Sequence, residues 1–168
     1  MTNNIYSEEK LNLLLEIIKD INKVNPEKII GKTFIQKIIF LIGRENIGDF
    51  PFTLYHYGPY SDELSDYLSF AEMLNYAKVE WNEYQGYSIS ILNKKDIKLP
   101  YAETSKIEEI INKYHDLSAN DISLVATAYY LKDEYKIPDE KIVEEVKKVK
   151  PKFSEDYIKK ILWECEVV

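Results

Sequence analysis

One stretch, residues 32–42, constrains the fold more than any other, because it is apolar on nearly every side of a helix. It reads Lys-Thr-Phe-Ile-Gln-Lys-Ile-Ile-Phe-Leu-Ile and is followed by Gly43. A helix with so little polar surface is typical of the centre of a protein. The rest of the chain is therefore expected to supply the layers that cover it.

The segment before this helix predicts a second helix with one apolar face. Ser7 is a hydroxyl N-cap, and Glu8 and Glu9 place negative charge at the positive end of the helix dipole. Asn25-Pro26 ends the helix, because the residue before a proline avoids helical backbone angles. The apolar stripe expected to face the core consists of Leu11, Leu14, Leu15, Ile18 and Ile21.

A third helix and a hairpin are predicted downstream. Ser61 is the expected N-cap of the helix. Two β-rich runs, 77–81 and 87–92, flank a Gly-containing loop and predict a hairpin. Three helices followed by a hairpin is the order of a winged helix-turn-helix domain. The inner face of the third helix is expected to consist of Leu64, Tyr67, Leu68, Ala71 and Leu74.

An aromatic insert, residues 49–57, separates the second helix from the third. It is predicted to be extended, with a Gly-Pro turn at residues 58–59. Strand alternation would then place Tyr55 and Tyr57 on one face and His56 on the other.

The remainder of the chain is predicted to be helical after a linker at residues 94–100. Tyr157 and Trp163 are expected to dock the last helix. The expected helices span residues 104–115, 119–134, 139–149 and 154–166. Their expected N-terminal signals are a capping box at Ser105 and Glu108 and N-caps at Ser118, Asp139 and Ser154.

These elements predict an α+β fold, mostly α. Residues 1–98 would form a winged helix-turn-helix-like domain, and residues 99–168 a helical bundle packed on it. Near the C-terminus, four lysines follow several glutamates three and four positions earlier, so that the two kinds of side chain can pair along a helix. This pattern favours a solvated helix face. The four lysines are Lys147, Lys148, Lys150 and Lys152.

The composition indicates the cellular compartment in which the protein is expected to work. The only cysteine is Cys165, so an intrachain disulfide and a cysteine zinc site are excluded. The N-terminus lacks a basic segment followed by an apolar one, and no apolar run approaches the roughly 18 residues that a membrane span needs. We therefore expect a cytoplasmic protein that does not enter a membrane.

Two motifs resemble a known family. Residues 31–40 read Gly-Lys-Thr-Phe-Ile-Gln-Lys-Ile-Ile-Phe, and residues 55–64 read Tyr-His-Tyr-Gly-Pro-Tyr-Ser-Asp-Glu-Leu. Together with Phe50-Pro51-Phe52 they resemble the YwgA-like proteins of bacteria and archaea. The same pairing is similar, more distantly, to the Panacea domain of SocA-like antitoxins. The resemblance implies a winged-helix-like fold and, through the antitoxins, a role in protein contact.

The second motif is also the densest polar and aromatic cluster of the chain. As a recognition surface it would use tyrosines, which supply large contact area at low entropic cost. As architecture it would instead use the Gly-Pro pair for a turn and the serine for a cap. The candidate partner-binding residues are Tyr55, His56, Tyr57, Tyr60 and Ser61.

Charge argues against the usual DNA-binding mode of a winged helix. The net charge is −7, and residues 61–76 hold four acids and no Lys or Arg, although the third helix normally enters the major groove. DNA binding stays open as the alternative function, through a different basic surface. The candidate residues for it are Lys32, Gln36, Lys37 and Arg44.

Catalysis is the third hypothesis, with His56 as a base. His56 and His115 are the only histidines, and a metal site pairing His56 with Asp62 lacks a second ligand at helical spacing. The sequence has no Gly-rich phosphate loop and no nucleophile elbow. We therefore expect a regulatory or adaptor protein without enzymatic activity, cofactor or metal, which binds a protein partner. Homodimerisation through the C-terminal helices is a separate hypothesis, motivated by their number and by the dimers common among winged-helix proteins.

Overall fold

The computed structural model describes residues 6–92, 99 and 101–168. Within these residues the chain is mixed α+β and mostly helical, with seven helices and two small antiparallel sheets. No helix in the described ranges combines the length and the apolar composition needed to cross a bilayer.

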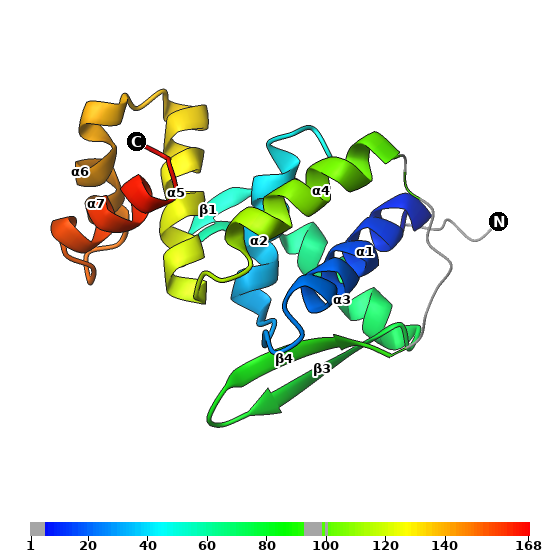
Figure 1. Ribbon diagram of the computed structural model, residues 1–168. Helices are drawn as coiled ribbons and strands as arrows, with labels where there is room; N and C mark the ends of the chain where they lie inside the picture. Colours follow the sequence, from blue (N-terminus) through cyan, green and yellow to red (C-terminus); the bar gives the residue numbers. More distant parts are fainter. Residues whose placement is uncertain (1–5, 93–98, 100) are drawn as a thin grey trace.

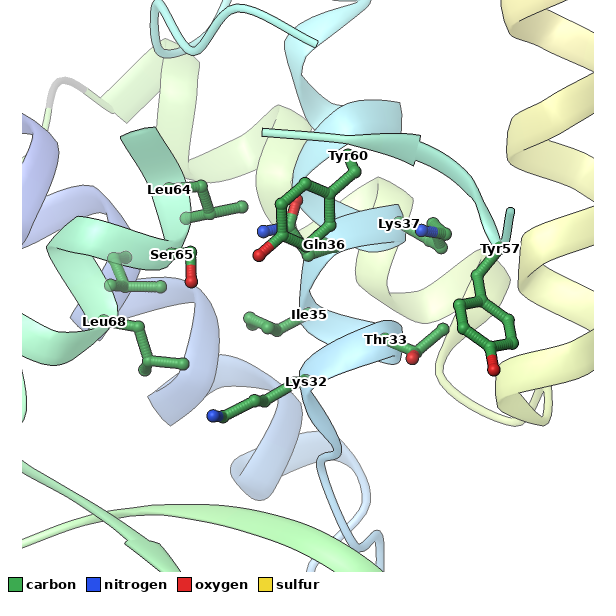
Figure 2. Close-up of a pocket in the computed structure, with 11 residues that line it drawn as sticks. Lys32, Thr33, Ile35, Gln36, Lys37, Tyr57, Tyr60, Leu64, Ser65 and Leu68 are labelled. Carbon is green, nitrogen blue, oxygen red and sulfur yellow. The ribbon is translucent and has the colours of Figure 1, made fainter. Parts of the chain in front are cut away.

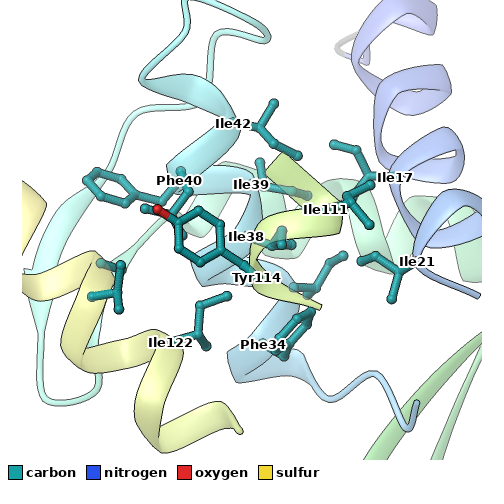
Figure 3. Packing of buried hydrophobic residues seen from close by; sticks show 14 of the residues in the cluster. Ile17, Ile21, Phe34, Ile38, Ile39, Phe40, Ile42, Ile111, Tyr114 and Ile122 are labelled. Atoms are coloured by element: carbon teal, nitrogen blue, oxygen red, sulfur yellow. The ribbon is translucent and has the colours of Figure 1, made fainter. Parts of the chain in front are cut away.

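The predicted central helix is confirmed as α2 (Lys32–Gly43), in which every side chain from Phe34 to Ile42 is buried. It packs against α4 (Tyr101–Tyr114) and α5 (Ala119–Tyr135). Figure 3 shows isoleucines of α1 (Glu8–Val24) meeting those of α2 and α4 in one cluster. One continuous core therefore joins the two halves of the chain.

The two helices that flank α2 in sequence begin at the predicted caps. Ser7 Oγ accepts from the backbone N–H of Lys10 at the start of α1. Ser61 Oγ accepts from the N–H of Leu64 at the start of α3 (Asp62–Met73). The predicted inner face of α3 is right except for Leu74, which is exposed because the helix has already ended at Met73.

The aromatic insert folds into its own hairpin, which was not predicted. β1 (Thr53–Tyr55) pairs with β2 (Gly58–Tyr60), so that the turn lies at residues 56–57 and not at 58–59. The Gly-Pro pair is part of β2, where proline is tolerated because a two-stranded sheet has only edge strands. Since Tyr57 lies in the turn, the predicted alternation of faces from residue 55 to 57 is wrong.

The second hairpin, β3 (Ala77–Asn82) with β4 (Gly86–Ile91), is confirmed. Its base is held by two backbone hydrogen bonds, from Ile89 N–H to the Ile30 carbonyl and from Leu92 N–H to the Tyr76 carbonyl. Figure 1 shows its far end extending beyond the helices.

The C-terminal helices form a small bundle on α5. Ser118 and Ser154 cap α5 and α7 (Glu155–Glu164) as predicted, through hydrogen bonds from the third residue of each helix. The predicted cap Asp139 is instead the first residue of α6 (Asp139–Val149), after Pro138. α5 packs against α2 on one side and against α6 and α7 on the other.

Two further predictions for this half are wrong. α4 begins at Tyr101, so Ser105 lies inside the helix and cannot cap it. Of the two residues expected to dock α7, Tyr157 does contact α5, where its hydroxyl donates to Asp121 Oδ1. Trp163 is 71% exposed and does not dock the helix, whose buried side chains are Ile158, Ile161 and Leu162. Most of the predicted linker, and the proposed domain boundary at residues 98–99, lie at or outside the limits of the described residues.

Candidate functional site: the tyrosine hairpin

Residues 53–60, hereafter the tyrosine hairpin, lie between α2, α5 and the start of α3. With three residues in each strand, the hairpin has few backbone hydrogen bonds of its own. Isolated two-stranded hairpins are marginal in water, so the conformation must be fixed from outside. Side chains of α2 and packing against α5 supply that support.

Gln36 holds the end of the hairpin. Its Nε2 donates to the carbonyl oxygen of Ser61 over 2.9 Å, and its Oε1 accepts from the N–H of the same residue over 2.9 Å. Both residues are buried. The amide thus satisfies both backbone groups of the residue that links β2 to α3, where unsatisfied groups would be costly.

Lys37 holds the middle of β2. Its Nζ donates to the carbonyl oxygen of Pro59 over 2.9 Å, and the residue is only 1% exposed. Burial lowers the pKa of Lys37 to about 7, and the positive charge of Lys150 acts in the same direction. A lysine in the core is unusual, and here its ammonium group ties the helix to the strand.

Gly58 lets α5 approach the hairpin backbone. Its φ angle is +103°, and a Cβ at this position would lie 2.7 Å from Thr127 Oγ1 and 3.4 Å from the carbonyl oxygen of Ser123. Any other residue would combine a disfavoured backbone angle with a clash. This position explains the glycine of the Tyr-Gly-Pro motif in physical terms.

The opposite side of the hairpin is open. Tyr55 is 54% and Tyr57 63% exposed, and His56 between them is exposed as well. Tyr60 is partly buried, with its ring 5.5 Å from that of Tyr55. Of the five predicted partner-binding residues, Tyr55, His56 and Tyr60 therefore lie together, Tyr57 is exposed in the turn beside them, and Ser61 is buried as a cap.

Lys150 supports the hairpin from the C-terminal bundle. It is 4% exposed, and its Nζ lies 5.6 Å from the centre of the Tyr57 ring. Burial, followed by the neighbouring charge of Lys152, lowers the pKa of Lys150 to about 8. The prediction of a solvated lysine run failed at this residue, because α6 ends there and its C-cap faces inward. The only sequence signal was the proline that follows.

The residues considered for nucleic-acid binding do not share a surface. Lys32 is exposed and lies over the Tyr87 ring, 4.0 Å from its centre. Gln36 and Lys37 are buried under the hairpin, where a duplex cannot reach them. Arg44 donates from Nε and Nη2 to the two carboxylate oxygens of Asp133, over 2.7 and 3.2 Å.

The two histidines lie in separate environments. His56 contacts the Tyr55 ring edge-on. His115 Nδ1 lies 3.1 Å from a carboxylate oxygen of Asp116 and 3.3 Å from Nδ2 of Asn25. In the part of the chain that the structure describes, no three potential metal ligands gather in one place.

In comparisons with known proteins, no family model matches the chain, and no curated protein matches it significantly.

Proposed function

We propose that this chain is a regulatory or adaptor protein without enzymatic activity, which binds a partner protein through the exposed face of the tyrosine hairpin. The observation that carries the proposal is the contrast between the two sides of the hairpin. Lys37 donates a hydrogen bond to Pro59 of β2, and Gln36 exchanges two hydrogen bonds with the backbone of Ser61 directly after it, while Tyr55 and Tyr57 remain exposed.

Rigid presentation lowers the entropic cost of binding. Tyrosine has few rotatable bonds and a polar tip, and residues of this kind often dominate the energy of protein interfaces. When the backbone beneath them is already ordered, little further ordering is needed in the complex. The tyrosine hairpin fits this pattern.

The proposal includes a winged-helix-like fold for the N-terminal part. The order α1, α2, α3, β3, β4 supports it, as does the resemblance of residues 31–64 to the YwgA-like proteins, which stays a prediction from the motifs. Protein contact through antitoxin-like proteins is implied only by the more distant resemblance. A cytoplasmic location also stays a prediction.

DNA-binding regulation is the alternative, and the charges oppose it. On α3, the helix that a winged helix would place in the groove, Asp62 and Asp66 are exposed. On the hairpin that would act as the wing, Lys78 is paired with Glu80. Phosphate contacts need free basic groups, which these elements do not offer.

The test is site-specific photo-crosslinking in the native cell. A photoreactive phenylalanine replaces Tyr57 in one variant and Tyr135, an exposed tyrosine at the end of α5, in the control. We expect a discrete protein adduct from position 57 and none from position 135. An adduct of twice the chain mass would identify a second copy as the partner.

Two outcomes would contradict the proposal. One is the same set of weak adducts from both positions, which would mean that the hairpin has no specific partner. The other is salt-sensitive binding of the purified chain to random duplex DNA, because that behaviour is the signature of phosphate contacts. The second outcome would favour the alternative function.

A further inference from the structure

An open groove of about 390 Å³ lies between the tyrosine hairpin and the C-terminal end of α6. Its lining consists of Leu54, Tyr55 and His56 of the hairpin and Val149, the last residue of α6. Two of these side chains are aliphatic, two are aromatic rings, and none carries a carboxylate. The groove therefore offers apolar contact area directly beside the exposed tyrosines.

Lys150 places a cation at the end of this groove, because it follows Val149 directly. Its Nζ lies 5.6 Å from the centre of the Tyr57 ring, and Tyr57 is the neighbour of His56 in the turn of the hairpin. The residue is only 4% exposed. Within the described residues, however, the polar atoms that are fully enclosed without a hydrogen-bond partner belong to other side chains. The tip of Lys150 therefore touches solvent.

The ammonium group of Lys150 has no anionic partner in the part of the chain that the structure describes. It forms no ion pair and donates no hydrogen bond there, and the face of the Tyr57 ring attracts the cation without neutralising it. Figure 2 shows a second cation, Lys37, extending from α2 toward the side on which Tyr57 lies. The positive charge of Lys150 lowers the pKa of Lys37, so the two cations are close enough to repel each other. Buried charge is normally paired, and here the pair is incomplete.

The neighbouring lysines do not supply a counter-charge either. Lys147 donates to the carbonyl oxygens of Pro151 and Phe153, and so closes the end of α6. Lys152 is exposed, lies over the Phe153 ring, and is close enough to lower the pKa of Lys150. On a chain with a net charge of −7, Lys150 and Lys152 make a local positive surface beside the groove.

We propose that the groove binds an acidic segment of the partner protein, in which a carboxylate pairs with Lys150 and adjacent apolar side chains lie against Leu54 and Val149. This inference rests on the proposed function, because it names the chemistry of the partner at the tyrosine hairpin. The carboxylate would supply the counter-charge that Lys150 lacks. Charge pairs that form away from bulk water, between partners with complementary potentials, also give specificity.

A carboxylate fits this surface better than the phosphates of a nucleic acid. Both have the required sign, but a duplex is held by several free cations at once. The surface described beside the groove offers two, Lys150 and Lys152, and one of them is reached only at its tip.

Fluorescence anisotropy of the purified full chain with a labelled peptide tests the proposal. The probe is a capped six-residue peptide in which glutamate and leucine alternate, because the groove is apolar along its lining and cationic at its end. The matched control peptide has glutamine in place of each glutamate. We expect the acidic peptide to bind with a Kd below about 1 mM, and the glutamine peptide to bind at least about tenfold more weakly.

The Lys150→Met variant separates a role in binding from a role in folding. It should weaken the acidic peptide by about tenfold and leave the glutamine peptide unchanged. Its thermal unfolding temperature should be equal to that of the wild type or higher, because methionine fills a similar space without an unpaired buried charge. A purely structural lysine would lower that temperature when replaced. Lys159→Met, an exposed lysine on α7, is the control and should bind like the wild type.

Three results would overturn the proposal. They are equal binding of the two peptides, no binding of the acidic peptide at about one millimolar, and wild-type affinity of Lys150→Met for that peptide. Displacement of the peptide by random duplex DNA would overturn it as well, in favour of phosphate contacts. The proposed function survives all of these results if position 57 still gives a discrete protein adduct in cells, whereas loss of that adduct removes the proposed function itself.

Discussion

The two hairpins of this protein are stabilised in different ways. β3–β4 pairs six residues in each strand, and beyond its base it extends away from the helices with Trp81 and Tyr84 exposed. The tyrosine hairpin pairs only three, yet α2 and α5 hold it through Gln36, Lys37 and the contact at Gly58. The longer hairpin is held mainly by its own ladder, and the shorter one by the core.

This difference shows which exposed aromatic side chains stand on a backbone that the core already holds in place. At the far end of β3–β4 the Trp81 and Tyr87 rings contact each other edge-on at 4.9 Å, a cross-strand pair that stabilises the hairpin itself. The exposed rings of the tyrosine hairpin stand on a backbone bonded to buried side chains. Changes at Gln36, Lys37 or Gly58 should therefore affect the tyrosine hairpin and leave the far end of β3–β4 nearly unchanged.

The largest expected effect comes from Gly58→Ala. The alanine would be strained at a φ of +103° and would clash with Thr127, and we expect the free energy of unfolding to fall by about 3–4 kcal/mol. Gly86→Ala is the matched control, because its φ is +74° but its nearest neighbour lies 3.9 Å away. Urea unfolding should show a loss of only about 1 kcal/mol there. Equal losses would mean that α5 does not clamp the tyrosine hairpin.

Gln36→Ala should have the next largest effect. It leaves the N–H of the buried Ser61 without a partner, whereas the Ser61 carbonyl keeps its hydrogen bond from the Ser65 N–H. We expect a loss of about 1–3 kcal/mol in urea unfolding. Amide exchange at Ser61 should accelerate more than exchange in β3–β4. Gln85→Ala, at an exposed position between β3 and β4, is the control and should change little. Unchanged exchange at Ser61 would contradict the anchoring role of Gln36.

Stability should rise with pH above neutrality. The pKa values of Lys37 and Lys150, about 7 and about 8, lie below the ordinary value of about 10.5 for lysine because both side chains are buried. The unfolded chain therefore binds more protons in this window, and we expect a gain of about 3–4 kcal/mol from about pH 7 to about pH 9. Asp20, whose pKa burial raises to about 7, acts mainly below that range.

Lys37→Met should reduce this dependence on pH, whereas Lys159→Met should keep it. Denaturant unfolding at several pH values measures both slopes. A wild-type stability that falls over the same range would show that the two lysines are not buried as described.

The smallest effect is expected at the other hairpin. Trp81→Ala removes an exposed ring and its contact with Tyr87, which should cost about 0.5 kcal/mol or less. Thermal unfolding measures the change, and amide exchange at Ser61 should stay as in the wild type. A loss as large as that of Gln36→Ala would remove the distinction between the two hairpins.

Local signals in the sequence predicted much of the fold. Four N-caps could be predicted because the cap hydroxyl and the backbone N–H that donates to it lie within four residues of each other. These caps are Ser7, Ser61, Ser118 and Ser154. The same signal misled at Ser105, since a serine followed by a glutamate also occurs inside helices. The turn of the tyrosine hairpin was predicted at residues 58–59 and lies at 56–57. A Gly-Pro pair often marks a turn, but here both residues are paired with β1.

The anchors of the site depend on contacts that local patterns do not carry. The apolar pattern of residues 32–42 predicted a buried helix, but not that Gln36 and Lys37 would bind the backbone more than twenty residues away. Lysines are usually exposed, so Lys37 and Lys150 were read as surface residues. The exposed tyrosines of the hairpin, Tyr55 and Tyr57, could be predicted as part of one cluster because they lie two residues apart.

The most direct test of the account compares the two hairpins in partner retention. The tagged chain is purified from its own cells as wild type, as Tyr55→Ser/Tyr57→Ser and as Trp81→Ser/Tyr84→Ser, and bound proteins are quantified by mass spectrometry. The account predicts that a protein retained by the wild type is lost from the first double variant and kept by the second. Loss from the second variant with retention by the first would contradict it and move the binding surface to β3–β4.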